Sequence, residues 1–253
     1  MNQSARRARI TEFLEVDGEV SIPDLATKLD VSEMTIRRDL DSLADQGRII
    51  RTHGGATAAG RVSFEFGFLK KRKSLQREKD EIGRLAAARV DDGKSVILDS
   101  GTTTLSVARA LRGQNNLTII TTSLPIASEL QYQSAISVLL LGGYLRSGSP
   151  DLSGGLTERN LDTLRADMAF LGADGVDPDG SVYSEDPDVA HMLTRMAASA
   201  AVVYVVADHS KLAKRALMRY GNAAEWAGLI TDGDADPGLV RSLAKSGVNV
   251  IQS

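Results

Sequence analysis

Residues 31–40 read Val-Ser-Glu-Met-Thr-Ile-Arg-Arg-Asp-Leu, and this stretch decides the fold of the N-terminal part of the chain. Ser32 is a favourable N-cap for a helix that begins directly after it. Ile36, Leu40 and Leu43 recur at helical spacing and predict a buried stripe. The polar residues between them are therefore expected on an exposed face.

The neighbouring segments complete a small domain. An apolar face at helical spacing predicts a first helix over 5–16, and Ser21 with Pro23 predicts the start of a second helix that ends near residue 29. After the third helix, residues 48–53 are typical of a strand, and Gly54-Gly55 is typical of a tight turn. Three helices followed by a basic strand and turn predict a winged helix-turn-helix.

This arrangement predicts contact with double-stranded DNA. Arginine on the first turns of such a helix can hydrogen-bond guanine, and threonine can contact a thymine methyl group or a phosphate. The predicted DNA-binding residues are Ser32, Glu33, Met34, Thr35, Arg37 and Arg38 on the helix, and Arg51, Thr52 and His53 in the wing. Taken alone, Arg37-Arg38 favours surface ion pairs, and it is the surrounding three-helix and wing pattern that favours DNA contact.

Composition limits the classes of protein. The formal net charge of −3 does not favour nucleic-acid binding, although residues 1–80 carry 15 Lys/Arg against 13 Asp/Glu. The absence of cysteine excludes disulfides and thiolate metal sites. The polar N-terminus does not resemble a signal peptide, and no apolar run is long enough to cross a membrane. We expect a cytoplasmic protein without cofactor, metal or membrane partner.

From residue 78 onward, strand and helix patterns alternate, which predicts an open, mainly parallel α/β sheet. We expect a DNA-binding domain over 1–57, a linker over 58–75 and an effector-binding and oligomerisation domain over 76–253. Apolar, strand-like runs occur at 95–98, 117–120, 137–141, 168–171, 202–206 and 228–230, and helical patterns at 103–111, 123–130, 156–164 and 189–200.

Glycine, hydroxyl and charged residues follow the predicted strands. Ligands of such sheets bind at the carboxyl ends of the strands, so these loops predict one crevice. Hydroxyls and helix amides can hold an anion, Lys211 can neutralise phosphate, and Asp99 and Asp208 can accept hydrogen bonds from sugar hydroxyls. Simple helix capping is the alternative for the first loop. The predicted effector-binding residues are Asp99, Ser100, Gly101, Thr102, Thr103, Thr122, Ser123, Gly142, Gly143, Asp174, Gly175, Asp208, Ser210 and Lys211.

The motif Thr35-Ile-Arg-Arg-Asp-Leu40, followed by His53-Gly-Gly-Ala56, resembles the DeoR family of bacterial regulators. The later part of the chain resembles that family's effector domain at 78–79, 99–103, 141–143, 167–171, 208–211 and 230–232. The resemblance implies a winged helix-turn-helix whose second helix enters the major groove. It also implies a domain similar in fold to sugar-phosphate isomerases, and a phosphorylated sugar as inducer.

Two positions depart from the family pattern. Thr122 stands where the family usually has asparagine, and the helix near 188–195 lacks the usual glutamate and lysine in register. Asp188, His191 and Arg195 are the candidates to replace them.

The leading hypothesis is a repressor of a carbohydrate operon, homodimeric or homotetrameric, which a phosphorylated sugar releases from operator DNA. Two alternatives stay open. One is an isomerase-type enzyme with an accessory DNA-binding domain, and the other is a regulator whose C-terminal domain only oligomerises.

Overall fold

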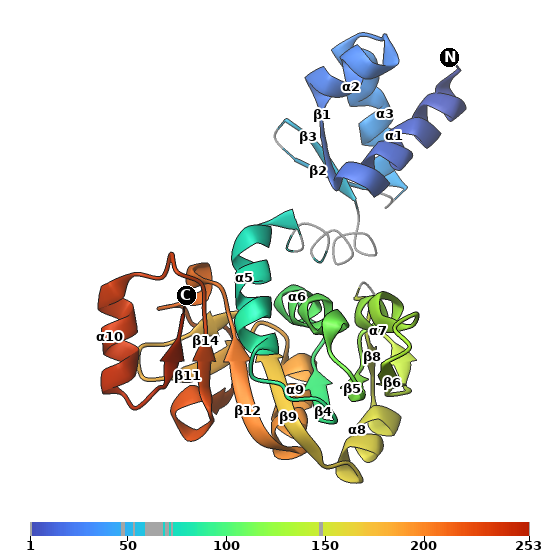
Figure 1. Cartoon of the computed structure of the whole chain (residues 1–253). Helices are drawn as coiled ribbons and strands as arrows, with labels where there is room; N and C mark the ends of the chain where they lie inside the picture. Colours follow the sequence, from blue (N-terminus) through green and yellow to red (C-terminus); the bar gives the residue numbers. More distant parts are fainter. Residues whose placement is uncertain are drawn as a thin grey trace. The chain divides into compact units, whose positions relative to one another are not determined.

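The computed structural model describes residues 2–46, 49–52, 54–58, 68, 71, 73–146 and 149–252, without the side chains of 15, 16 and 58. The chain forms two compact units, an N-terminal one within residues 1–71 and a larger C-terminal one within residues 72–253 (Figure 1). Most of the predicted linker 58–75, and His53 of the predicted wing, lie outside the described residues.

The N-terminal unit has three helices and a three-stranded antiparallel sheet of order β1-β3-β2, which confirms the predicted winged helix-turn-helix. The caps are those expected, because Ser21 Oγ accepts from Asp24 N–H at 3.2 Å and Ser32 Oγ accepts from Thr35 N–H at 3.3 Å. The elements are α1 (Gln3–Asp17), β1 (Glu19–Ser21), α2 (Ile22–Leu29), α3 (Glu33–Asp45), β2 (Ile49–Arg51) and β3 (Gly55–Ala58).

The small sheet differs from the sequence prediction in one respect. Gly55 was expected in a turn, but it begins β3 and pairs with Ser21 of β1. A Cβ atom on Gly55 would lie 1.8 Å from the Val20 carbonyl oxygen, so the close approach of these two strands requires glycine. Strand β1 has only three residues, too few to leave a pattern in the sequence.

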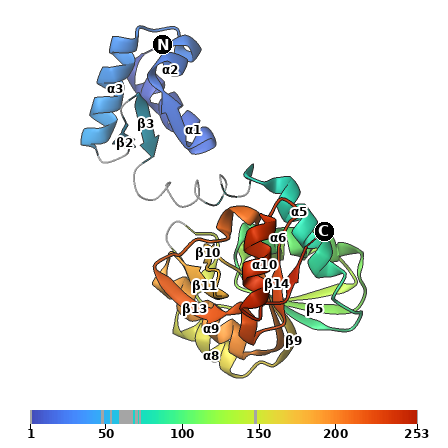
Figure 2. The same cartoon turned by 90° about the vertical axis from the view of Figure 1, so that its left-hand side faces the viewer.

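The C-terminal unit is built on a seven-stranded sheet of order β15-β14-β12-β9-β4-β5-β6, in which every neighbouring pair is parallel (Figure 1). Figure 2 shows the same unit turned by 90°. All six predicted strands are present, with ends within two residues of those expected. The strands are β4 (Ser95–Leu98), β5 (Leu117–Thr121), β6 (Ile136–Leu140), β9 (Ala166–Gly172), β12 (Ala200–Val206), β14 (Gly228–Ile230) and β15 (Val250–Ile251).

Helices cover both faces of this sheet. Right-handed crossovers place α6 and α7 on one face and α9 and α10 on the other. The four predicted helices are present, whereas α5 and α10 were not predicted. The helices are α5 (Gln76–Ala87), α6 (Thr102–Ala110), α7 (Leu124–Leu130), α8 (Gly155–Asp162), α9 (Pro187–Ala198) and α10 (Pro237–Lys245). No helix within the described residues is both long and apolar enough to span a membrane.

Two smaller antiparallel sheets complete the C-terminal unit, and the sequence patterns did not predict them. One joins three strands in the order β10-β11-β13, and the other is a hairpin of two-residue strands. Their strands are β10 (Gly175–Val176), β11 (Ser181–Ser184) and β13 (Met218–Asn222) in the first, and β7 (Tyr144–Leu145) and β8 (Leu152–Ser153) in the second.

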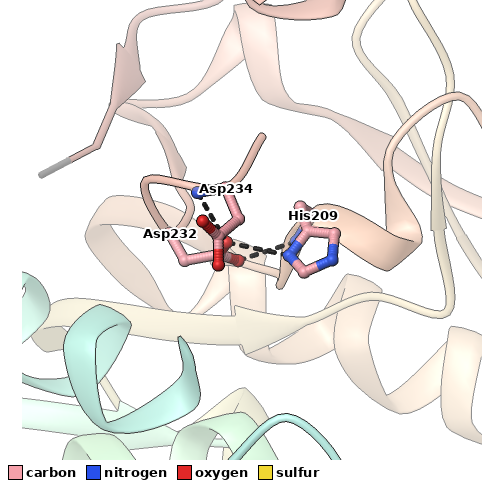
Figure 3. Close-up of side chains that lie close together, drawn as sticks. All are labelled: His209, Asp232 and Asp234. Atoms are coloured by element: carbon pink, nitrogen blue, oxygen red, sulfur yellow. Dashed lines mark hydrogen bonds and ion pairs between the residues drawn. The ribbon is translucent and has the colours of Figure 1, made fainter. Parts of the chain in front are cut away.

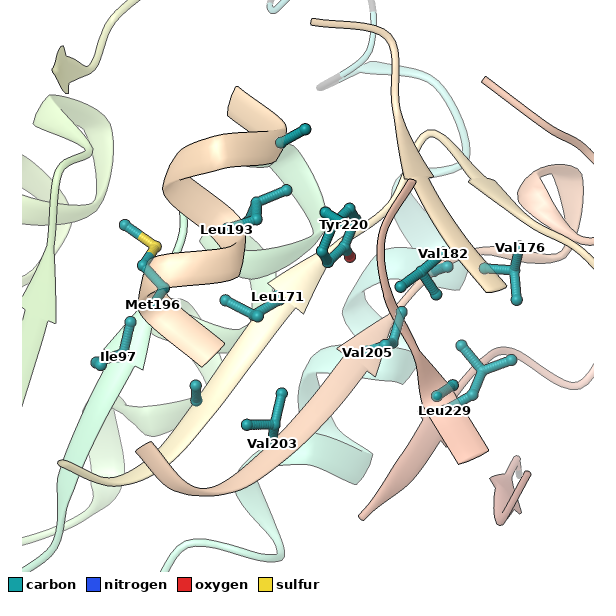
Figure 4. Close-up of a cluster of buried hydrophobic side chains, with 14 of the residues drawn as sticks. Ile97, Leu171, Val176, Val182, Leu193, Met196, Val203, Val205, Tyr220 and Leu229 are labelled. Carbon is teal, nitrogen blue, oxygen red and sulfur yellow. The ribbon is translucent and has the colours of Figure 1, made fainter. Parts of the chain in front are cut away.

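The main core lies between α9 and the sheet. Leu193 and Met196 of α9 face Leu171 of β9 and Val203 of β12, and all four are buried (Figure 4). Strands β9 and β12 are apolar on consecutive residues because helices cover both of their faces. This packing holds the carboxyl ends of the central strands in fixed positions, where the predicted effector loops begin.

Candidate functional site

The first surface of interest is the exposed face of α3. Ser32, Glu33, Met34, Arg37 and Arg38 are exposed, and Thr35 is half-buried. The buried stripe beneath them contains the predicted Ile36, Leu40 and Leu43. The residues predicted to contact DNA on this helix therefore lie together at the surface, and their role in DNA contact stays a prediction.

The two arginines of this face differ. Arg37 Nη2 lies 3.7 Å from Glu33 Oε2, one turn earlier, and both side chains are about half exposed. Arg38 has no ionic or hydrogen-bonding partner in the described part of the chain. A guanidinium without an internal partner breaks no ion pair when it binds a base or phosphate. Arg38 is therefore more readily available for such a contact than Arg37.

Asp39 holds α1 against α3, and sequence reasoning missed it. Its buried carboxylate accepts from Arg6 Nε at 2.5 Å and from Arg7 Nε at 3.0 Å. The sequence did contain an indication of this role, because Asp39 follows Ile36 by three residues and so falls on the predicted buried stripe of the helix. A carboxylate on such a stripe needs cationic partners, and two arginines of α1 supply them.

The wing arginine has an internal role that was not expected. Arg51 Nε lies 3.0 Å from Asp41 Oδ1, and Arg51 Nη1 donates to the Gly55 carbonyl at 2.8 Å. These contacts tie the end of β2 to α3 and to the start of β3. Thr52 is exposed beside it. Arg51 thus orients the wing. Its predicted contact with DNA would use the N–H groups of the guanidinium that Asp41 and Gly55 leave free.

In the C-terminal unit, Asp99 braces the loop that follows β4. Its Oδ1 accepts from Gly101 N–H at 2.8 Å and Thr104 Oγ1 at 2.5 Å, and its Oδ2 accepts from Gly172 N–H at 2.7 Å. Burial raises the pKa of Asp99, although these hydrogen bonds oppose the rise. Both of its oxygens hold the loop in shape, and Asp99 also lines a pocket beside the loop, so its predicted contact with sugar hydroxyls stays a prediction.

The loop itself leads into the N-terminus of α6. Gly101 is the N-cap residue, and a Cβ atom there would lie 3.1 Å from Asp99 Oδ1. The first-turn N–H groups of Thr102 and Thr103 have no intrahelical acceptor, which suits an anion. Ser100 Oγ donates to Asp151 Oδ2 at 3.1 Å. The backbone amides of this loop could hold an anion, whereas the Ser100 hydroxyl is already hydrogen-bonded to Asp151. Anion binding by the loop stays a prediction.

A small pocket, with a cavity volume of about 20 Å³, opens beside this loop. α9 supplies an apolar wall of Val189, Met192, Leu193 and Met196. The polar wall contains Asp99, Ser100, Thr122, Arg146, Asp151, Ser153 and Asp188. The pocket thus joins the carboxyl ends of β4 and β5 to the hairpin β7–β8 and to α9.

Arg146 is the cation of this pocket, and sequence reasoning did not identify it. Its Nε lies 3.0 Å from Asp151 Oδ1 and its Nη1 lies 2.7 Å from Asp186 Oδ2. Burial lowers the pKa of Arg146, but Asp151 and Asp186 outweigh this effect and raise it overall. Asp186 also caps α9, so a single guanidinium connects the hairpin to the start of that helix.

The remaining predicted loops form a second group. Lys211 Nζ lies 4.0 Å from Asp174 Oδ1, and Asp208 Oδ1 accepts from Ser210 N–H at 3.1 Å. Neither Lys211 nor Asp208 lines the pocket that contains Arg146. Asp174, the partner of Lys211, lies close enough to Asp99 of the pocket for its charge to add to the rise that burial causes in the pKa of Asp99. That all of these loops form one crevice therefore stays a prediction.

The remaining members of the predicted set have packing or capping roles. A Cβ atom on Gly143 would lie 2.3 Å from Thr157 Oγ1, and one on Gly175 would lie 2.5 Å from the Lys214 carbonyl oxygen. Ser123 caps α7, accepting from Ile126 N–H at 3.3 Å. Gly142 lies at the end of β6, outside the lining of the pocket.

The three residues of α9 named as candidates to replace the family's glutamate and lysine differ in position. Asp188 lines the pocket. His191 Nε2 is exposed and lies 3.6 Å from Glu158, and Arg195 pairs with Asp162, both of them on α8. His191 and Arg195 therefore join two helices, and the pocket wall that α9 presents is mainly apolar.

His209 and two aspartates form a separate cluster at the ends of β12 and β14 (Figure 3). His209 Nδ1 lies 2.9 Å from Asp232 Oδ1, and Asp232 accepts from His209 N–H at 2.8 Å and from Asp234 N–H at 3.1 Å. Burial lowers the pKa of His209, but the bond to Asp232 and the charge of that carboxylate raise it overall. The cluster joins two loops by hydrogen bonds.

Comparison with known proteins covers both units. Residues 6–62 match the family model of the DeoR-like helix-turn-helix domain, and residues 74–233 match that of the DeoR C-terminal sensor domain. The glycerol-3-phosphate regulon repressor of Escherichia coli is 33% identical over 92% of both chains. The transcriptional repressor GlcR of Bacillus subtilis is 34% identical over 99% of this chain and 96% of its own.

Among solved structures, ribose 5-phosphate isomerase A from Methanocaldococcus jannaschii aligns with 55% of each chain, at a TM-score of 0.42 and 20% identity. The family models and the relatives account for nearly the whole sequence, in the order helix-turn-helix and then sensor domain. The chain belongs to the DeoR family.

Proposed function

We propose that this protein is a cytoplasmic transcriptional repressor of a carbohydrate operon, and that a phosphorylated sugar releases it from operator DNA. The observation that carries the proposal is the exposed face of α3, with an Arg38 that has no partner among the described residues, in the same chain as a sensor domain. The printed names of the relatives, repressors of transcription, support a regulator rather than an isomerase.

Release follows from linkage between two sites. If the effector and the operator favour different conformations of the chain, each weakens the binding of the other by the same factor. A coupling of about 1–3 kcal/mol changes operator affinity about 5–150-fold. This is enough to switch a promoter without unfolding either unit.

For the effector, we propose that its phosphate binds at the loop 100–103, where the first-turn amides of α6 have no intrahelical acceptor and Ser100 lines the pocket. Arg146 is the nearest cation that lines the same pocket. An anion that binds Arg146 competes with Asp151 and Asp186, and so loosens the link between the hairpin β7–β8 and the start of α9. This exchange of ionic partners is our candidate for the step that couples effector binding to a change of conformation.

The test is an operator-release assay with a panel of sugar phosphates, each paired with its unphosphorylated sugar. We expect one phosphate ester to release the operator while its parent sugar does not. Arg146→Met should abolish the response and leave operator affinity without effector unchanged. Lys211→Ala, in the second loop group, should weaken the response less, because Lys211 does not line the pocket.

The same panel is measured by thermal unfolding, since a ligand that binds the folded chain raises its melting temperature. A melting temperature that no sugar phosphate shifts, together with no release, would favour the alternative in which the C-terminal domain only oligomerises. Turnover of a sugar phosphate by the full chain would favour the isomerase alternative.

A further inference from the structure

Strand β6 is an edge strand with free backbone groups. It is hydrogen-bonded to β5 on one side only. The Ala135 carbonyl accepts from Leu117 N–H at 3.2 Å, and Leu141 N–H donates to the Thr121 carbonyl at 2.9 Å. Because backbone direction alternates along a strand, Val138 and Leu140 direct their N–H and C=O groups away from β5. These groups have no partner in the part of the chain that the structure describes.

This edge lacks the features that usually protect a sheet from further pairing. Five residues of β6 pair with β5 in an unbroken register, with no bulge, proline or charged side chain in the strand. At the opposite edge, β15 is only two residues long. A five-residue edge without protection is suited to pair with another strand.

Exposed apolar side chains surround the carboxyl end of this edge. Leu139 of β6 is 43% exposed, Tyr144 of β7 is 83% exposed and Leu156 of α8 is 50% exposed. Leu156 and Tyr144 approach the backbone near this end of the strand, because a Cβ atom on Gly142 would lie 3.7 Å from Leu156 Cδ2 and one on Gly154 would lie 3.4 Å from Tyr144 Cδ2. Apolar groups gathered in this way mark an interaction surface.

The segment that forms this edge is almost free of charge. Between residues 113 and 145 the single charged residue is Glu129, in a chain in which 25% of residues are charged. Glu129 accepts from Arg109 Nε at 3.1 Å and also pairs with Arg112, so this cluster keeps a net positive charge. Residues 130–145, which include β6 and Tyr144, carry no charged side chain. An edge without charges of its own suits a second copy, because a two-fold axis brings each group close to its own equivalent, where like charges would repel.

We propose that β6, with Leu139, Tyr144, Leu145 and Leu156, is the face by which two copies of this chain associate. We call this set the β6 face. Two copies related by a two-fold axis would pair their β6 strands antiparallel, so that one continuous sheet crosses the interface. The exposed N–H and C=O groups of Val138 and Leu140 then gain partners, and the apolar side chains on either side become buried.

The test is the mass of the full chain in solution, measured by light scattering coupled to gel filtration. Leu139→Glu introduces a charge that the paired face would have to bury, and we expect it to halve the wild-type mass. Leu217→Glu is the matched control, because Leu217 is 72% exposed and lies outside the β6 face. It should keep the wild-type mass. Circular dichroism and a melting curve establish that each variant is folded, and Tyr144→Glu provides a second disruption if Leu139→Glu fails to fold.

A mixing experiment separates self-association from pairing with a different surface. Leu139→Glu and Leu139→Lys should each have the halved mass when alone, and their equimolar mixture should regain the wild-type mass because opposite charges then meet across the axis. A monomeric wild type, an unchanged mass in folded Leu139→Glu, or a mixture that stays at the halved mass would each overturn the proposal. All of these measurements are made without effector or DNA, so their outcome is independent of the proposed function.

Discussion

The recognition helix and the sensor pocket each present an arginine, and the two arginines are held very differently. Arg38 on α3 is exposed and has no ionic or hydrogen-bonding partner among the described residues, whereas Arg146 in the pocket is held by Asp151 and Asp186. A free guanidinium is ready to bind, and a paired one must first exchange partners. The arginine on the face of α3 predicted to contact DNA is thus available in advance, while an anion that binds Arg146 must compete with Asp151 and Asp186.

The two units also differ in how they accommodate a buried carboxylate. Asp39 in the N-terminal unit is compensated by the positive charges of Arg6 and Arg7. Asp99 in the C-terminal unit receives three hydrogen bonds from uncharged donors, and burial raises its pKa. Ion pairing fixes the position of one helix on another, whereas hydrogen bonding to backbone amides fixes the shape of a loop.

The largest expected effect concerns Asp39. In Asp39→Ala, two partly buried arginines lose their shared carboxylate, and we expect the N-terminal unit to lose about 3 kcal/mol of stability. Hydrogen exchange of α1 and α3 amides in the full chain measures this loss. Asp41→Ala, which removes an exposed carboxylate paired with Arg51, is the control and should cost at most about 1 kcal/mol. Equal protection in the two variants would mean that the buried pair does not hold α1 on α3.

A smaller effect separates the two arginines of α3. We expect Arg38→Ala to weaken operator binding by about 1–3 kcal/mol if the side chain contacts a base. Arg37→Ala should cost less, because the bound state of Arg37 must also offset its lost contact with Glu33. Fluorescence anisotropy with labelled operator measures both. Unchanged affinity in the two variants would contradict the assignment of α3 as the recognition helix.

The smallest effect is a pH dependence in the C-terminal unit. Since the pKa of folded His209 is raised above 6.5, its bond to Asp232 stabilises the protein fully below that value, and the contribution is lost as pH rises through the folded pKa. His209→Asn should therefore destabilise the chain more near pH 5 than near pH 8, by less than about 1 kcal/mol because His209 is partly exposed. Melting temperatures of wild type and variant across this range measure the difference. A constant difference would show that the protonated form of His209 is not favoured.

Elements with a local signal could be predicted, and elements without one could not. The strand runs of the main sheet and the caps Ser21 and Ser32 were identified because a few adjacent residues define each of them. Helix α5 was missed because its sequence is strongly charged, although Ile82 and Ala86 lie on a buried face. The sheet β10-β11-β13 was missed because β13 pairs with a strand more than 30 residues earlier in the chain.

The same distinction applies to the candidate site. Ser100, Thr122 and Asp188 were named from the sequence and line the pocket, whereas Arg146 was not named. The partner of Arg146 on α9, Asp186, lies 40 residues away along the chain. No spacing rule connects two residues so far apart, and the role of Arg146 could be recognised only once the hairpin β7–β8 and α9 were placed together.

Capping and apolar periodicity depend on neighbouring residues, and for this reason most elements, the helix-turn-helix and its exposed arginines could be predicted from the chain alone. Which charges are compensated depends on the folded arrangement: Asp39 by Arg6 and Arg7, Arg146 by Asp151 and Asp186, and Asp99 by hydrogen bonds such as that from Gly172 N–H. Electrostatic compensation depends on distance in space and on burial, and folding sets both for residues that are far apart in the chain. For this reason the sequence predicted which residues lie in the loops that follow the strands. It did not predict which of their charged groups already have partners inside the protein.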